Sequence, residues 1–139
     1  MLYSGKGDKG KTDLFGCGVR ISKSSAVSEA LGSLDEVNSF LGFSKIKSKA
    51  EKRRVGKKGP YFADVVHDLQ RSLFIVQAEV AGTPMSVTRE RVKEIEHLID
   101  TIAKELPPIH SFFISGGTEL ASLFDFARTL ARRAERRVV

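Results

Sequence analysis

Residues 115–139, SGGTELASLFDFARTLARRAERRVV, decide the fold. Gly116 and Gly117 open this stretch, and neither glycine nor proline occurs after them. Because these two residue types are the usual helix breakers, the sequence predicts one long helix beginning after Thr118. Its apolar residues recur at steps of three and four, as on the buried stripe of an amphipathic helix. They are Leu120, Leu123, Phe124, Ala127, Leu130, Ala131 and Ala134.

A charged stripe runs beside the apolar one. Arg128, Arg132 and Arg136 are four residues apart, so their guanidinium groups follow one another along one face at steps of about 6 Å. Aligned arginines repel each other unless an anion lies between them, and their planar groups match phosphate or carboxylate oxygens. The stripe therefore indicates either an anion site or a solvated basic face.

The rest of the chain predicts three more helices and no strand pair. Apolar residues recur at helical steps in residues 26–44, with Ser24 or Ser25 as the cap, in residues 61–81 and in residues 88–106. The last of these carries a short coiled-coil-like seam. Four helices with short connections predict an all-α, up-down helical bundle, in one domain covering residues 1–139.

Residues 45–60, KIKSKAEKRRVGKKGP, interrupt this pattern. They are rich in lysine and arginine and poor in apolar residues, which is typical of a mobile, basic linker. Such a segment could hold RNA or DNA phosphates, but it lacks the interleaved aromatic residues that stack on bases. A solvated helix–helix connection is the favoured interpretation.

Composition limits the function classes. Of the 139 residues, 41% are hydrophobic and 29% charged, as in ordinary globular domains, and the formal net charge of +6 favours anionic partners. No apolar run has the length of a membrane span, so no membrane partner is expected. The single Cys17 excludes an internal disulfide and a thiolate metal cluster, which favours a reducing, cytoplasmic location.

Residues 4–18, SGKGDKGKTDLFGCG, interleave five glycines with Lys6, Lys9 and Lys11. Such a segment can turn several backbone N–H groups and ammonium groups toward one anion. It also matches GxxxxGK[ST] literally. A true P-loop must follow a buried strand and open a helix, and neither context is present, so we reject that fold. Binding of a triphosphate by the segment remains a hypothesis.

Three blocks together resemble the PduO-type ATP:cob(I)alamin adenosyltransferases. They are YSGKGDKGKTDLFG, EALGSLDEVNSFLG and FFISGGTELASLFDFARTLARRAERRVV, with Ser22-Lys23 after the first. They cover about half of the chain and follow the order found in the family; the arginine run after the glycine pair is the most specific.

The resemblance implies a five-helix bundle assembled as a homotrimer, with ATP bound between neighbouring subunits. The implied enzyme passes the 5′-deoxyadenosyl group of ATP to the cobalt of a reduced corrinoid, cob(I)alamin, and releases triphosphate with the help of Mg²⁺. It further implies a partner reductase or a corrinoid-dependent acceptor enzyme. Four helices are evident, so the resemblance also leads us to expect a further helix beyond residue 139.

Site roles follow from the same resemblance. Residues 1–23 form the nucleotide loop, within which Ser4, Gly5, Lys6, Gly7, Thr12, Asp13 and Lys23 match ATP-contacting positions. Arg132, Arg133, Glu135 and Arg136 match the second ATP-contacting segment. Asp35 and Arg128 match a pair that joins two subunits beside the site, and together with Arg132 they are the expected catalytic residues. Phe112 matches a residue that packs on the corrin, and no side chain is assigned as a metal ligand.

Three positions depart from the family pattern. Lys6 stands where the family usually has threonine, Asp13 where it has a small residue, and Ser115 where it has proline. A carboxylate at position 13 beside phosphates is unfavourable unless a cation lies between them.

Two other classes of function stay open at this point. A basic helical module could bind nucleic acid or another polyanion through residues 45–58 and the C-terminal arginines, with affinity that falls steeply with salt. A helical interaction protein could use only the seam of residues 92–106, and nucleotide would then leave its melting temperature unchanged.

Overall fold

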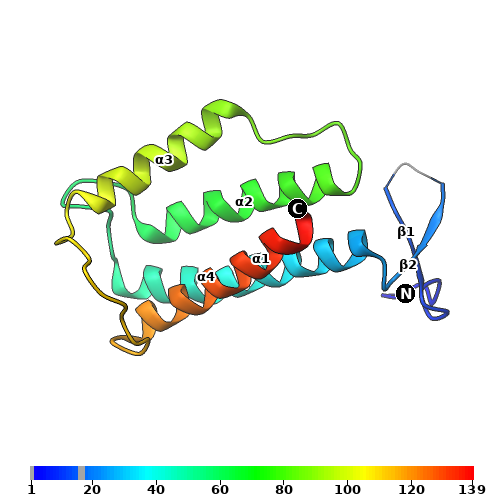
Figure 1. Ribbon diagram of the computed structural model, residues 1–139, viewed down its shortest axis with the longest axis horizontal. Coiled ribbons are helices and arrows are strands. Elements are labelled where there is room, and N and C mark those ends of the chain that lie inside the picture. Colours follow the sequence, from blue (N-terminus) through cyan, green and yellow to red (C-terminus); the bar gives the residue numbers. More distant parts are fainter. Residues whose placement is uncertain (1, 16–17) are drawn as a thin grey trace.

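The computed structural model describes residues 2–15 and 18–139, and within them it contains four helices and one small sheet. The helices are α1 (Ala26–Glu51), α2 (Phe62–Val80), α3 (Arg89–Ala103) and α4 (Glu119–Val138). Successive helices run in opposite directions, and α4 returns alongside α1 (Figure 1). The predicted up-down helical architecture is therefore confirmed for these four helices. No helix among the described residues is long and apolar enough to cross a membrane.

Side-chain caps set three of the helix starts. The hydroxyl of Ser25 accepts a hydrogen bond from the backbone N–H of Ser28, which decides between the two candidate caps of α1. Thr88 and Thr118 cap α3 and α4 in the same way, through Arg91 and Ala121. The sequence thus predicted the start of each of these helices within one residue.

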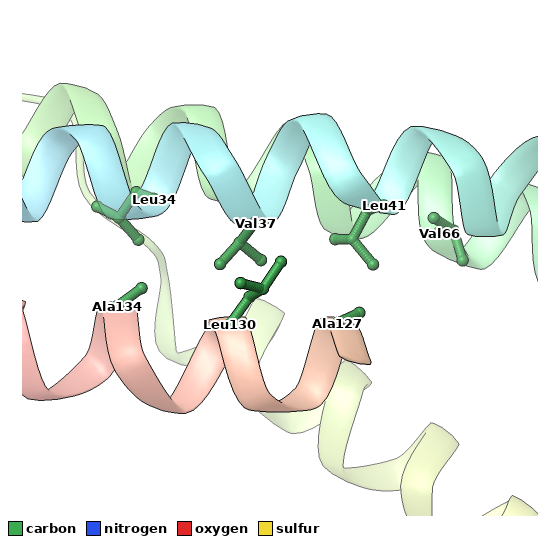
Figure 2. Packing of buried hydrophobic residues seen from close by; sticks show 7 residues of the cluster. All are labelled: Leu34, Val37, Leu41, Val66, Ala127, Leu130 and Ala134. Carbon is green, nitrogen blue, oxygen red and sulfur yellow. The ribbon is translucent and has the colours of Figure 1, made fainter. Parts of the chain in front are cut away.

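The core lies where α1 faces α4. Leu34, Val37 and Leu41 of α1 point toward Ala134, Leu130 and Ala127 of α4, and Val66 of α2 closes one end (Figure 2). Alanines at two of the three α4 positions let the two backbones approach closely. Phe40 of α1 adds an edge-on aromatic contact with Phe126 of α4, with ring centroids 4.8 Å apart.

The absence of strands was a wrong prediction. Residues Lys11–Asp13 (β1) and Arg20–Ser22 (β2) form an antiparallel pair in which Thr12 lies opposite Ile21. Each strand has three residues, too few for an alternating apolar pattern to be visible in the sequence. This hairpin lies beyond the end of the bundle at which α1 begins (Figure 1).

The linker expected at residues 45–60 was also placed wrongly, since α1 continues to Glu51. Ser44 and Ser48 are fully buried, so this part of α1 presents small residues to its neighbours. Lys45 and Lys47 between them are half-buried and contact Gln70 of α2 and Glu119 of α4. The remaining residues form a closed loop in which the N–H of Val55 donates to Pro60 and that of Phe62 donates to Arg53.

Helix α3 has the least cover of the four. None of its residues is buried, and Val92 and Ile99 of its predicted seam are exposed. It lies along α2 (Figure 1), where the guanidinium of Arg91 donates to the hydroxyl of Ser72 at 3.0 Å. Within the described part of the chain, most of the seam is therefore open to solvent, since Val92, Ile99 and Leu106 are exposed.

Candidate nucleotide and corrinoid site

The segment before β1 is a tight series of turns. Gly5 and Gly10 have φ angles of 65° and 74°, in the left-handed region that favours glycine. Backbone N–H groups of Asp8 and Gly10 donate to the carbonyls of Gly5 and Gly7, and that of Lys23 donates to Gly10 at 2.9 Å. The segment is therefore built by its own backbone and is joined to the residue that follows β2.

Gly7 is the point of closest approach in this loop. A Cβ atom at position 7 would lie 2.9 Å from the Nζ atom of Lys23 and 3.1 Å from its Cε atom, so a larger residue there would displace the Lys23 side chain from its place. The loop and Lys23, predicted from separate parts of the sequence to bind one ATP, thus lie against each other. Glycine backbone and an ammonium group at one place suit an anionic ligand.

Arg20 holds the loop to the hairpin, and sequence reasoning missed it. Its guanidinium forms an ion pair with Asp13 at 3.2 Å and donates to the carbonyl oxygens of Lys6 and Lys11. Arg20 lies opposite Asp13 across the strand pair, a relation that only the hairpin register reveals. A carboxylate at position 13 was expected to be unfavourable beside phosphates unless a cation lies near it. The guanidinium of Arg20 is such a cation and offsets the charge of Asp13.

The arginines of α4 divide between two faces. Arg133 pairs with Glu36 and Arg137 with Glu29, so this face binds α4 to α1 of the same chain. Arg132 and Arg136 precede them by one residue, which turns their side chains by about 100° around the helix. Both are exposed, as is Glu135, and in the described part of the chain they form no ion pair. They face outward, toward whatever lies beside this chain.

Arg128 is held within its own helix. Its Nε and Nη2 atoms both lie 2.9 Å from Oδ1 of Asp125, and the other carboxylate oxygen of Asp125 accepts a hydrogen bond from the Ser115 hydroxyl. The Ser115 hydrogen bond, followed by that of Arg128, holds the pKa of Asp125 below its usual value. The chain by itself does not bring Arg128 to Asp35.

Asp35 lies on the side of α1 that faces α2. Its exposed carboxylate borders two hollows, one of about 290 Å³ and one of about 670 Å³. The smaller is lined by polar side chains that include Asn38, Gln70 and Arg71. The larger is walled by apolar side chains, among them Phe15, Leu31 and Met85. Asp35 is therefore accessible to a group that comes from outside the chain.

Phe112 lies far from the nucleotide loop. It is fully exposed in the connection between α3 and α4, at the end of the bundle where α1 finishes, while the hairpin lies at the opposite end (Figure 1). Helix α1 has 26 residues and is about 39 Å long. One copy of this chain cannot bring both features to one small ligand.

The structure thus gathers the predicted site residues into separate groups. Ser4, Gly5, Lys6, Gly7, Thr12, Asp13 and Lys23 form the nucleotide loop with its support. Arg132, Glu135 and Arg136 form an outward face on α4, while Arg133 is engaged with Glu36. No hydrogen bond or ion pair joins the loop to α4 among the described residues. Cys17 lies outside those residues.

Metal ligands are not concentrated at any of these places. In the described ranges, no group of three or more His, Cys, Asp or Glu side chains could hold a metal ion. These residues therefore do not fit a metal ion that is held by protein side chains alone. Mg²⁺ typically keeps several waters and binds through substrate phosphates with one or two carboxylates, so a magnesium-bound triphosphate needs no such cage.

Comparison with known proteins places these features in a family. The family model described as cobalamin adenosyltransferase matches residues 2–139. The corrinoid adenosyltransferase PduO of Citrobacter freundii is 37% identical over 145 residues, covering 99% of this chain and 40% of the relative. The corrinoid adenosyltransferase of Bacillus subtilis is also 37% identical, with 99% of this chain and 70% of that protein covered. The chain therefore spans about two fifths of the PduO relative.

Solved structures agree in fold. A variant of the PduO-type ATP:corrinoid adenosyltransferase from Lactobacillus reuteri, complexed with cobalamin and ATP, superposes with a TM-score of 0.84 at 27% sequence identity. The superposition covers 99% of this chain and 74% of that one. A second variant of the same enzyme, complexed with ATP, gives a TM-score of 0.81.

Proposed function

This chain belongs to the cobalamin adenosyltransferase family, and from that membership we propose that it transfers the 5′-deoxyadenosyl group of ATP to a reduced corrinoid. The observation that carries the proposal is the match of residues 2–139, which includes both the nucleotide loop and the arginine helix. The products are adenosylcobalamin and triphosphate. The protein is thus proposed to be an alkyl-transferring enzyme.

The proposed reaction requires little general acid–base catalysis by the protein. The cobalt of cob(I)alamin attacks C5′ of ATP with its own electron pair; a cobalt–carbon bond forms, cobalt becomes Co(III), and the C5′–O electron pair leaves with the triphosphate. Since the nucleophile needs no deprotonation, the protein has to align the two reactants and stabilise the leaving anion.

The residues of the loop suit the second of these tasks. Lys6 and Lys23 supply ammonium groups and the glycines supply close backbone N–H groups, while Arg20 fixes their arrangement through Asp13. These groups stand in place before the triphosphate is released, so they would stabilise its charge with little reorganisation. When bound, Mg²⁺ would neutralise part of the same charge.

We propose that the site is completed by another copy of the chain. The support is the outward direction of Arg132 and Arg136, the access to Asp35, and the distance between Phe112 and the loop. In a ring of three copies, the loop of one chain would meet α4 of the next, and Arg128 would pair with Asp35 across the interface. Phe112 would then cover one axial face of the corrin.

The proposed setting is a reducing, cytoplasmic compartment, since the chain has a single cysteine and cob(I)alamin is a strong reductant. A reductase that supplies cob(I)alamin, or an enzyme that accepts the adenosylated product, is the proposed partner.

The test is spectroscopic. Chemically reduced cobalamin, ATP and the protein are mixed without oxygen, and the absorbance is followed as cob(I)alamin is converted to adenosylcobalamin. We expect conversion that requires ATP and that falls by at least about 100-fold in Arg132→Ala, consistent with loss of a charge-stabilising group. Arg89→Ala, an exposed arginine on α3, is the matched control. No conversion by the unaltered protein would end the proposal.

The alternative of a polyanion-binding module makes the opposite forecast. Binding to single-stranded DNA would weaken steeply with salt and would be indifferent to free ATP. Part of the basic stretch that suggested it is now helical, in α1.

A further inference from the structure

The connection between α3 and α4 presents a run of apolar side chains to solvent. Phe112, Phe113 and Ile114 are 105%, 76% and 98% exposed, respectively, and residues 107–117 contain no helix or strand. Three successive large apolar residues in water cost free energy unless a ligand or partner covers them. An extended segment without its own structure also needs an external contact to hold it in place.

That contact is made directly after the apolar run. The hydroxyl of Ser115 donates to Oδ2 of Asp125 on α4, and this is the one hydrogen bond that ties residues 107–117 to the rest of the described chain. Gly116 follows with a φ angle of 114°, a conformation that residues with a side chain rarely adopt. It allows the chain to turn from Ser115 into the cap of α4.

The same carboxylate serves a second residue. Oδ1 of Asp125 accepts from Arg128, one turn further along α4, at 2.9 Å. A carboxylate has two oxygens, and here one takes the loop and the other takes the guanidinium. Both contacts lie at the surface, with the Arg128 side chain 60% exposed and that of Asp125 35% exposed. The two contacts therefore share one anchor on a rigid helix.

We propose that Asp125 is a positioning residue that holds the apolar run of residues 112–114 and the Arg128 guanidinium in a fixed relation. The inference rests on the proposed function, in which the apolar run packs on the corrinoid and Arg128 helps to form the site. Asp125 itself touches neither substrate. Its effect is to reduce the freedom of a segment that would otherwise have to be ordered when the corrinoid binds.

The position of the corrinoid matters because the reaction depends on the alignment of its cobalt with C5′ of ATP. A corrinoid held loosely presents its cobalt to C5′ over a wider range of geometries, and few of these are productive. Loss of the tether would therefore weaken corrinoid binding more than ATP binding, since the tether holds the apolar run that packs on the corrinoid, whereas ATP is bound by the nucleotide loop and the outward arginines of α4.

The experiment compares four variants of the full chain. Ser115→Ala removes only the loop contact, and Asp125→Ala removes both contacts. Ser115→Thr keeps a hydroxyl and serves as the rescue. Ser122→Ala is the matched control, because that hydroxyl donates to a backbone carbonyl at the start of α4 and does not touch the loop.

Two readouts are taken. Chymotrypsin cleavage at residues 112–113, without substrates, reports the mobility of the segment. We expect cleavage to accelerate by about 3- to 10-fold in Ser115→Ala and Asp125→Ala only. Steady-state kinetics should show the KM for cob(I)alamin raised by about 5- to 10-fold in these two variants, with the KM for ATP changed less than about 2-fold.

The outcomes separate the inference from the function. Unchanged cleavage in Asp125→Ala would overturn the proposal, and so would faster cleavage with an unchanged KM for cob(I)alamin. Recovery in Ser115→Thr supports it. If the unaltered protein does not convert cob(I)alamin at all, the proposed function and the positioning role both fail, although faster cleavage would still establish the tether.

Discussion

At the scale of single residues, Gly7 is the position of the nucleotide loop that lies against Lys23. A methyl group there would lie 2.9 Å from Nζ of Lys23, and a flexible lysine can move away at little cost in stability. We therefore expect Gly7→Ala to keep the melting temperature of the protein within a few degrees but to weaken ATP binding by about 10-fold, since Lys23 is displaced.

Calorimetric titration with ATP measures this effect. Gly117→Ala is the matched control, because a Cβ atom there meets nothing within 4 Å. An unchanged Kd for ATP in Gly7→Ala would show that Lys23 does not contact the nucleotide.

Asp125 makes a prediction about pH. Its pKa is lowered in the folded protein by Ser115 and then by Arg128, so folding favours the charged carboxylate. This contribution to stability is present above the unfolded-state pKa of about 3.9 and is lost as the pH falls through the lower, folded-state pKa. The difference in urea midpoint between the unaltered protein and Asp125→Asn should therefore shrink below about pH 4.

The measurement is a series of urea unfolding curves from pH 7 to pH 3. The difference will be small, because exposed ion pairs contribute little to the free energy of unfolding. A difference that stays constant over the whole series would contradict the pairing of Asp125 seen in the structure.

At the scale of elements, the loop between α1 and α2 has a defined, closed structure, whereas composition predicted a mobile linker. A substitution at Gly59 distinguishes the two. A Cβ atom at Gly59 would lie 2.0 Å from the carbonyl oxygen of Val55, a backbone atom that cannot step aside easily. Val55 is 2% exposed, so the loop is anchored by a buried side chain. We expect Gly59→Ala to lower the free energy of unfolding by about 1–3 kcal/mol.

Urea unfolding measures it, with Gly117→Ala again as the control. The mobile linker expected from composition would tolerate the change at Gly59 without loss of stability, and that result would contradict the closed loop.

The helices were predictable because their apolar residues repeat at a helical period and three of their caps are Ser or Thr. The continuation of α1 through residues 45–51 was not, because its buried residues at this end are Ser44 and Ser48, which carry no hydrophobic signal. The ion pairs of Arg133 and Arg137 join residues about 100 positions apart, and nothing local in the sequence marks them.

The candidate site, like the fold, was predictable from the sequence only in part. Motif resemblance predicted that the nucleotide loop and the arginine run belong to the site, which stays a prediction, and the structure adds the contacts that hold these two segments in the fold. Arg20 and Asp125 hold other residues in place and were not predicted. The role of Arg20 depends on the hairpin register, and that of Asp125 depends on its contact with Ser115; both form only in the folded chain. Resemblance alone also could not say that Arg133 would be engaged with Glu36.

At the scale of the whole molecule, the arrangement of one chain leaves the predicted site in pieces. The loop lies at one end of the bundle and the connection that carries Phe112 lies at the other (Figure 1), while Arg132 and Arg136 are exposed on α4. These pieces make one site only if copies of the chain stand side by side. The central claim is therefore that the nucleotide loop of one copy meets α4 of the next.

Mixing two inactive variants tests that claim most directly. Lys23→Ala damages the loop and Arg132→Ala damages α4, and each is first purified alone and shown to be folded. The two are then mixed, their subunits are exchanged, and conversion of cob(I)alamin with ATP is measured. In a head-to-tail ring with random exchange, about a quarter of the sites would combine an intact loop with an intact α4. We predict recovery of activity toward about a quarter of the unaltered level; no recovery after proven exchange would contradict a site shared between copies.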